Sequence, residues 1–233
     1  MYRKDLKDEF YTFKAKKEGY PARSVYKLKE IDEKFKIIKE GDKVLDLGCA
    51  PGSWLLYISK KVGGEGRVLG IDLEDINFHP QGNIIFMKRD ILKMDEIDFK
   101  NLQGRIDVVV ADLAPKTSGV ISVDVAKSLE LSQKAFEIAK IVLNKGGNFV
   151  CKIFEGEGVN DFVKEVRKSF KVLKRVRPSA VMKRSKEFYI VSKGFALGQV
   201  ASRSTQSAKW KTIVVPAAAI SRQTSQSSVV FVV

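Results

Sequence analysis

The sequence predicts an α/β fold in which a mostly parallel sheet carries helices on both faces. Three observations lead to this prediction. Apolar, β-branched runs recur along the chain, helical patterns separate them, and a glycine turn follows the first run. Such runs are typical of strands that are buried on both faces of a parallel sheet. A chain of 233 residues suffices for one core of this kind and a short appendage.

The strands can be placed from the apolar runs. Five parallel strands are expected at 43–47, 67–72, 84–88, 106–112 and 147–154. The periodic segment 123–143 is expected to be a crossover helix that stops at Asn144 to Gly147. Two further strands, 171–177 and 187–191, are joined by a link too short for a crossover helix, so we expect them to pair antiparallel. The prediction is a seven-stranded, Rossmann-like sheet with an antiparallel last strand.

Segments outside this α/β domain, which we place at 41–195, differ from it in composition. Residues 1–40 are predicted to form a basic, helical N-terminal extension packed on the core, with Val25, Leu28 and Ile31 on one face. Residues 196–233 lack Asp and Glu and contain only four Lys and Arg. A native tail and an extension of non-native origin both fit that composition, and we assign it no function.

The charge balance indicates the kind of partner. The net charge is +14, from 42 basic and 28 acidic residues, and most of the excess lies before residue 196. Such an excess favours a polyanion, because each phosphate contact releases counterions. Cys49 and Cys151 are expected to be buried thiols, and the single His79 argues against zinc chemistry, so no metal is expected. Without a membrane-length apolar run or a signal core, we expect a cytoplasmic protein with no membrane partner.

The turn after the first strand indicates the ligand class. The strand ends near Asp46, the turn contains Gly48 and Gly52, and a helix is expected from about Ser53. Glycine lets a ligand approach the main chain closely. The spacing lacks the Gly-x-Gly-x-x-Gly fingerprint of dinucleotide enzymes. It resembles instead the Asp-x-Gly-x-x-x-Gly of S-adenosylmethionine (SAM)-dependent methyltransferases; the alternative is an ordinary turn with a capping serine.

Four charged residues occur where strand or helix ends can direct them at one crevice: Lys27, Asp112, Lys152 and Glu187. Lys152 is the most informative, because its neighbours Cys151 and Ile153 are apolar and an unpaired buried lysine is costly. We expect Asp112, on the adjoining strand, to be its partner. The alternative is a snorkelling lysine in a purely structural ion pair.

These residues lie in motifs that resemble the FtsJ/RrmJ family of RNA ribose 2′-O-methyltransferases over about residues 10–194. The motifs are Ala22 to Leu28, Asp46 to Trp54, Ala111 to Pro115, Lys152 to Gly158 and Arg184 to Tyr189. The resemblance implies a catalytic tetrad at Lys27, Asp112, Lys152 and Glu187. It implies SAM contacts at Gly52, Trp54, Asp72, Asp90 and Asp112. Cys49, Ser53 and Lys186 depart from the family pattern and bear on the geometry of the turn.

The positions of the implied cofactor residues have their own rationale. Asp72 closes the second strand, where a carboxylate can accept both ribose hydroxyls, although it could also be a loop cap. Asp90 follows the third strand and could accept from the adenine amino group, or cap a helix. Trp54 could touch the ligand or shape the turn by packing.

The resemblance implies methyl transfer from SAM to a ribose 2′-hydroxyl, with Lys152 as the base or as a charged group that orients the hydroxyl. The expected target is a uridine of large-subunit ribosomal RNA, because the compact body has no added RNA-binding domain. The alternatives are a transfer RNA methyltransferase and a non-catalytic SAM-binding ribosome assembly factor. A base methyltransferase is disfavoured by the Asp112-Leu-Ala-Pro sequence. We expect a monomer that binds RNA and no DNA.

Two sets of residues are expected to hold the RNA. The basic ones are Lys4, Lys7, Lys14, Lys16, Lys17, Arg23, Lys183, Arg184 and Lys186. The aromatic ones, which could stack on bases, are Phe10, Tyr11, Phe13 and Tyr20. A solvated helical face is the alternative for each of them.

Overall fold

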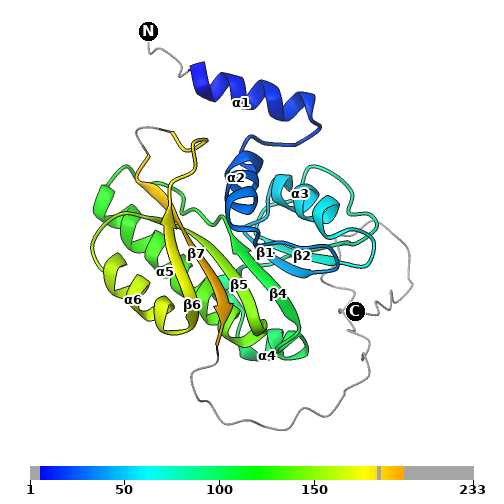
Figure 1. Ribbon diagram of the computed structural model, residues 1–233. Coiled ribbons are helices and arrows are strands. Elements are labelled where there is room, and N and C mark those ends of the chain that lie inside the picture. The colour runs from blue at the N-terminus through cyan, green and yellow to red at the C-terminus, as the bar shows by residue number, and fades with distance from the viewer. Residues whose placement is uncertain (1–5, 183–184, 197–233) are drawn as a thin grey trace.

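The computed structural model describes residues 6–182 and 185–196, and it contains the predicted seven-stranded sheet (Figure 1). The strands are β1 (Lys43–Leu47), β2 (Arg67–Asp72), β3 (Ile84–Lys88), β4 (Ile106–Ala111), β5 (Leu143–Phe154), β6 (Phe170–Val176) and β7 (Glu187–Phe195). The α-helices are α1 (Leu6–Lys17), α2 (Val25–Phe35), α3 (Ser53–Val62), α4 (Glu96–Phe99), α5 (Ile121–Val142) and α6 (Val159–Lys168). Two 3₁₀ turns, η1 (Ile91–Lys93) and η2 (Lys100–Leu102), flank α4.

The strand order is β3-β2-β1-β4-β5-β7-β6. The first five strands are parallel, whereas β7 is antiparallel to both β5 and β6, so the reversed last strand is confirmed. The chain order reverses between β1 and β4. Ligands of open α/β sheets bind outside the carboxyl ends of the strands at such a point.

Two apolar layers explain why the strands read as continuous hydrophobic runs. In β4, Val108 and Val110 face the layer that contains α2 and α3, whereas Val109 and Ala111 face the layer that contains α5 and α6. All four side chains are fully buried. Figure 1 shows these helices on opposite sides of the sheet, which confirms the predicted arrangement.

The two N-terminal helices differ in how deeply they pack. In α2, Val25, Leu28 and Ile31 are completely buried, as the sequence pattern predicted. The helix α1 rests on the body through few contacts, among them the ion pair between Asp8 and Arg23. Figure 1 shows α1 as a projection above α2.

The structure corrects the expected boundary between α5 and β5. The helix ends at Val142 and the strand starts at Leu143, so the predicted stop at Asn144 to Gly147 lies inside the strand. An irregular register against β4, between Ile106 and Val108, accommodates these residues. A Cβ atom on Gly147 would lie 2.9 Å from the carbonyl oxygen of Asp107, so glycine permits this close approach.

Two further features of the fold differ from the prediction. The strand β7 extends to Phe195, past the predicted end at Val191. The segment between β3 and β4 contains α4, which starts with a capping box between Asp95 and Asp98. From residue 197 on, the predicted tail lies outside the described residues.

In the part of the chain that the structure describes, no helix has the length and apolar character to cross a membrane.

Candidate active site

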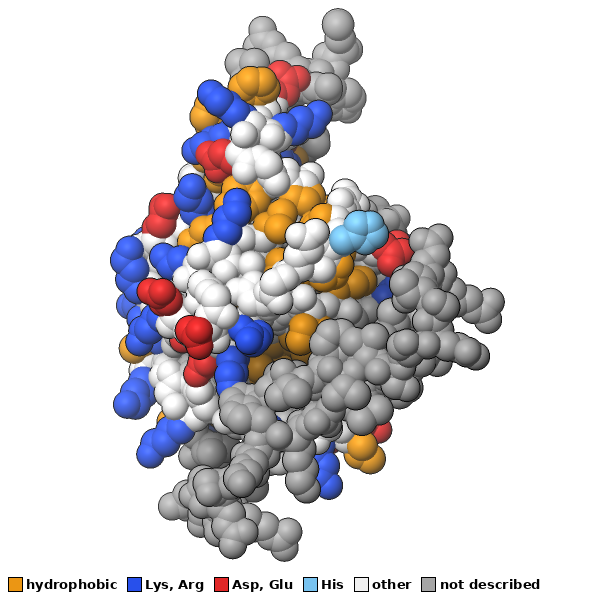
Figure 2. Space-filling view, turned by 90° about the vertical axis from the view of Figure 1, so that its right-hand side faces the viewer, with side chains coloured by type: hydrophobic (Ala, Val, Ile, Leu, Met, Phe, Trp, Pro, Cys, Tyr) orange, Lys and Arg blue, Asp and Glu red, His pale blue; other side chains and the backbone are white. Residues whose placement is uncertain are grey.

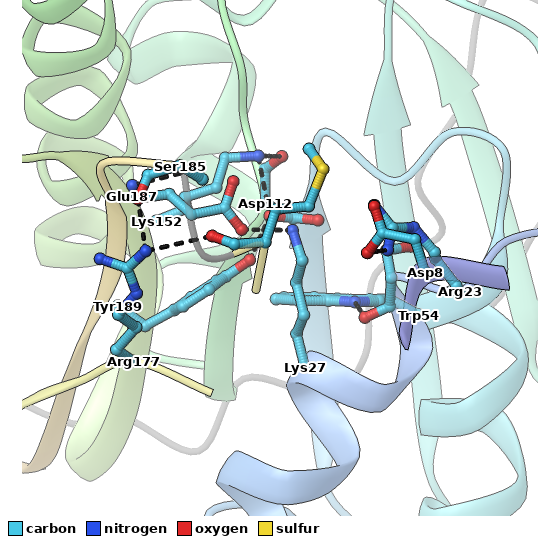
Figure 3. A network of polar contacts seen from close by, with 12 residues as sticks. Asp8, Arg23, Lys27, Trp54, Asp112, Lys152, Arg177, Ser185, Glu187 and Tyr189 are labelled. Atoms are coloured by element: carbon cyan, nitrogen blue, oxygen red, sulfur yellow. Dashed lines mark hydrogen bonds and ion pairs between the residues drawn. The ribbon is translucent and has the colours of Figure 1, made fainter. Parts of the chain in front are cut away.

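The four predicted charged residues meet at the carboxyl edge of the sheet (Figure 3). Asp112 is the first residue after β4, Lys152 lies inside β5, and Glu187 opens β7. Lys27 comes from the first turn of α2. Residues separated by up to 160 positions in the chain therefore form one polar cluster.

Lys152 and Asp112 form a buried pair. The Lys152 Nζ atom lies 2.9 Å from Asp112 Oδ1 and donates to the Asp112 carbonyl oxygen at 2.8 Å. The side chain of Lys152 is only 6% exposed. An ammonium group at such depth needs these partners, because burying an unpaired charge is expensive. The predicted partnership between Lys152 and Asp112 is thereby confirmed.

The surroundings of Asp112 keep it ionised. Burial alone would raise the pKa of its carboxyl, but the charges of Lys152 and Lys27 oppose that effect. Hydrogen bonds from Tyr189 and Lys152 act in the same direction as the two charges, and the pKa of Asp112 is lowered overall. Asp112 is therefore an anion and hydrogen-bond acceptor at neutral pH.

Lys27 and Glu187 form a second ion pair beside the first. Their charged atoms lie 2.5 Å apart, and both side chains are mostly buried. Lys27 also lies over the ring of Tyr189, 6.0 Å from its centroid. Two lysine–carboxylate pairs thus lie beside one tyrosine.

That tyrosine, Tyr189, has no role among the sequence-based predictions. Tyr189 is completely buried, and its hydroxyl donates to Asp112 Oδ1 at 2.7 Å. Burial, followed by the charge of Asp112, raises the pKa of Tyr189 well above its usual range, so it remains a donor. It pairs directly with Lys152 across the β5–β7 ladder. The signal was its position two residues after Glu187, because alternate residues of a strand share a face.

The glycine turn lies on the other side of the switch point, between β1 and α3. Gly48 and Gly52 have φ angles of +78° and +105°, which L side chains rarely adopt. A Cβ atom on Gly48 would lie 2.7 Å from Leu113 Cδ2, and one on Gly52 would overlap the ring of Phe78. Both the backbone angles and the neighbouring side chains therefore require glycine at these two positions.

Asp72 and Asp90 both accept hydrogen bonds from backbone N–H groups. The two Asp72 oxygens accept from the N–H groups of Ala50 and Glu74, at 2.8 and 2.9 Å. Asp90 caps η1 by accepting from Leu92 N at 3.0 Å. The capping alternatives that the sequence allowed are thus observed. Each carboxylate oxygen has a second lone pair, so capping leaves capacity for a ligand.

Asp46 adds a further carboxyl group to this side. It is completely buried, and neither of its oxygens has a hydrogen-bond partner among the described residues. Burial raises its pKa well above the usual range, and the charges of Asp112 and Asp72 add to the shift. Carboxyl groups thus line this part of the edge, although the net charge of the protein is strongly positive. Among the described residues, no group of three or more His, Cys, Asp or Glu side chains could hold a metal ion.

Comparison with known proteins identifies the family. The sequence profile of the FtsJ-like methyltransferases matches residues 20–195, which is more than half of the chain. The chain belongs to the FtsJ-like methyltransferase family. The match contains all four residues of the polar cluster and the glycine turn.

Relatives of this methyltransferase have names that describe their substrate. The chain is 45% identical over 188 residues to ribosomal RNA large subunit methyltransferase E of Desulfatibacillum aliphaticivorans, covering 81% of this chain and 91% of the relative. It is 44% identical over 192 residues to the protein of that name from Methanothrix thermoacetophila, covering 82% and 73%. Among solved structures, a ribosomal RNA methyltransferase of Plasmodium falciparum is similar with a TM-score of 0.65 and 28% identity, covering 76% and 98%.

Trp54 of the methyltransferase packs inside the protein. It is 3% exposed, its indole N–H donates to the Ser24 carbonyl oxygen at 2.9 Å, and its ring lies 6.1 Å from that of Tyr189. The tryptophan therefore connects the helix after the glycine turn to the polar cluster. A contact between Trp54 and the cofactor stays a prediction.

The residues predicted to hold RNA differ in accessibility. Tyr20 is buried beneath Lys60, and Arg23 is engaged by Asp8, which makes both less available than predicted. Phe10 and Phe13 are exposed, by 59% and 71%. Figure 2 shows hydrophobic and basic side chains next to each other on the projection at the top of the view. Lys4, Lys183, Arg184 and the side chain of Lys7 lie outside the described residues.

Proposed function

We propose that this methyltransferase transfers a methyl group from SAM to a ribose 2′-hydroxyl of RNA, on a uridine of large-subunit ribosomal RNA. The observation that supports catalysis most directly is the buried Lys152–Asp112 pair, which Tyr189 joins and the Lys27–Glu187 pair flanks. The names of relatives at 44–45% identity and the net charge of +14 support a ribosomal RNA substrate.

The residues around the glycine turn fit SAM. Carboxyl groups suit its positively charged sulfonium and amino groups, and glycine at Gly48 and Gly52 favours close contact between a ligand and the main chain. In this proposal Gly52 gives room, Asp72 accepts the ribose hydroxyls and Asp90 accepts the adenine amino group. Asp112 lies where the two halves of the edge meet, and Trp54 supports the turn. When bound, SAM supplies an electrophilic methyl group.

Lys152 is the proposed general base for the ribose hydroxyl. A base that takes the proton as the new bond forms contributes typically 10²–10⁴-fold. The Lys152 nitrogen has three positions besides its carbon, and the carboxylate and the carbonyl of Asp112 occupy two. A neutral amine keeps two N–H donors for these contacts, which leaves its lone pair for the hydroxyl proton.

The remaining cluster residues place one positive and one negative side chain, Lys27 and Glu187, beside the Lys152–Asp112 pair. We propose that Lys27 and Glu187 also fix the substrate and the lysine in position. The alternative role for Lys152, a charged group that orients the hydroxyl, would place the rate gain in positioning.

Two parts of the chain have different roles in this proposed function. Residues 1–40 serve as a basic extension that contributes to RNA binding, and 41–195 form the catalytic domain. The protein works as a monomer in the cytoplasm. The packing of α2 on the core supports a fixed geometry between the two parts.

Methyl transfer from labelled SAM tests this function. The acceptors are ribosomal particles, free ribosomal RNA and transfer RNA, and the proteins are the wild type, Lys152→Met and the exposed-lysine control Lys140→Met. Label in alkali-resistant dinucleotides is expected, because a methylated 2′-oxygen cannot attack the neighbouring phosphate. Lys152→Met should reduce transfer at least 100-fold with SAM affinity retained. SAM binding without transfer to any RNA would contradict catalysis and favour the assembly factor, and transfer RNA as the best acceptor would contradict the ribosomal substrate.

A further inference from the structure

We propose that the outer face of α1 is a docking platform for an unpaired stretch of RNA. The platform consists of Phe10, Phe13, Lys16 and Lys17. Bases stack on the two phenylalanine rings, and the two lysines hold phosphates of the same strand. The inference deepens the proposed function and rests on it for the nature of the RNA.

The two faces of α1 differ in what they contact. The inner face holds the helix to the body. Tyr11 contacts the ring of Tyr26, with centroids 5.2 Å apart, and its hydroxyl lies 3.3 Å from Ser179 Oγ. Ala15 on the same side is 1% exposed. These contacts fix the orientation of the helix and leave the other face toward solvent.

The outer face presents two large rings to water. Phe10 and Phe13 are three residues apart and so lie side by side on the helix surface. They are 59% and 71% exposed. The exposed large hydrophobic residues elsewhere in the described chain are all aliphatic, so both aromatic ones belong to this helix. Single exposed hydrophobic residues are ordinary, but a pair of adjacent rings needs a partner to gain from burial.

The neighbouring charges determine what the partner is. Lys16 and Lys17 are exposed beside the rings, and Glu9, one turn before Phe13, is exposed as well, so basic residues are in excess there. Asp8, by contrast, is engaged with Arg23. A flat apolar surface next to ammonium groups matches an unpaired nucleotide, which combines a stackable base with a phosphate. Base pairs inside a duplex are already stacked on each other, so a duplex would use only the lysines.

The platform lies on the side of the molecule where an RNA can reach the active site. Figure 1 shows α1 above α2, and the first turn of α2 carries Lys27 into the polar cluster. An RNA strand held by α1 would therefore be anchored next to the nucleotide that is methylated. Such an anchor raises the affinity for RNA without requiring further contacts from the residues of the polar cluster.

Binding of oligoribonucleotides tests the platform. The variants are Phe10→Ala/Phe13→Ala, Phe10→Leu/Phe13→Leu and Phe10→Tyr/Phe13→Tyr, with Ile97→Ala as a control at a 78% exposed residue of α4. Dissociation constants are measured by fluorescence anisotropy for a single strand and for its duplex. We expect the Ala and Leu variants to bind the single strand about tenfold or more weakly, since stacking is worth about 1–3 kcal/mol per base. The Tyr variant and the control should stay within about twofold of the wild type.

Several results would overturn the platform. Full binding by the Leu variant would indicate an apolar contact that does not depend on stacking. Equal weakening for duplex and single strand would contradict recognition of unpaired RNA. Only variants with the thermal midpoint of the wild type are compared. Methyl transfer by the wild type is measured separately. Transfer with unimpaired binding by the Ala variant defeats the platform alone, whereas ring-dependent binding without transfer to any RNA defeats the proposed function alone.

Discussion

The two halves of the carboxyl edge hold their polar groups in different ways. Over β1, β2 and β3, the carboxylates of Asp72 and Asp90 are fixed by backbone N–H groups of nearby turns. Over β4, β5 and β7, the side chains of Asp112, Lys152 and Tyr189 are fixed by one another. One half is organised by main-chain donors, and the other by contacts between side chains from distant parts of the sequence.

This difference has an energetic consequence. Replacing a side chain that caps a turn destabilises mainly that turn. A member of a buried network leaves its partners unsatisfied when it is removed, and such groups are costly in a low dielectric. Removing a polar side chain from the β4–β5–β7 half should therefore be more destabilising and less additive than removing Asp72 or Asp90.

The largest expected effect comes from breaking the buried pair. Lys152→Met should lower the free energy of unfolding by about 3 kcal/mol, because the Asp112 carboxylate stays buried without its main counter-charge. The exposed pair between Lys140 and Glu165 is the control, and Lys140→Met should cost less than about 1 kcal/mol. Urea unfolding at neutral pH measures both. Adding Asp112→Asn to Lys152→Met should cost less than the two single effects together; equal costs for the two lysine variants would remove the distinction between the halves.

The glycine turn is expected to give the next largest effect. Gly52→Ala should destabilise the protein by about 2 kcal/mol through its φ of +105° and the overlap with Phe78. Gly82 also has a positive φ but open space around it, so Gly82→Ala should cost only about 1 kcal/mol. Adding Phe78→Ala to Gly52→Ala separates overlap from backbone strain. The same thermal or urea curves for both glycine variants would argue that space at the turn is unimportant.

Tyr189→Phe tests the network through its pH dependence. The variant loses a hydrogen bond to a carboxylate, which should lower the free energy of unfolding by about 1.5 kcal/mol at pH 7. Because the pKa of Asp112 is lowered by folding, its contribution is present above its unfolded pKa of about 4 and is lost as the pH falls through the folded value. The gap between wild type and variant should thus be largest at neutral pH and narrow below about pH 4. Parallel curves from pH 7 to pH 2.5 would show that Tyr189 does not act through the ionised carboxylate.

The smallest effects are expected for the two carboxylates of the β1–β2–β3 half. Asp72→Ala should weaken SAM binding about tenfold, since Asp72 also holds the Ala50 N–H of the turn, and Asp90→Ala should weaken it less. Both variants should unfold within about 1 kcal/mol of the wild type. Calorimetric titration with SAM measures affinity, and Asp75→Ala serves as an exposed-carboxylate control. A loss of stability as large as that of Lys152→Met would contradict the comparison.

The sequence predicted much of the fold because each signal was local. The apolar runs predicted all seven strands, including the antiparallel β7, and Val25, Leu28 and Ile31 were correctly placed in the core. The predicted strand start at residue 147 was wrong, because the local pattern of Gly146 and Gly147 indicates a helix stop, whereas β5 starts at Leu143 and an irregular ladder accommodates both glycines. That ladder depends on β4, which the local sequence does not contain.

The sequence by itself determined the strand pattern, the glycine turn and the identity of Lys27, Asp112, Lys152 and Glu187 as one set. Only the tertiary structure decided that Tyr189 donates to Asp112, that Trp54 packs inside, and that Phe10 and Phe13 are exposed whereas Tyr20 is buried. The physical reason is the range of the interactions. Periodicity and backbone conformation act over a few residues, whereas burial and hydrogen-bond partners depend on which distant segments the fold brings together.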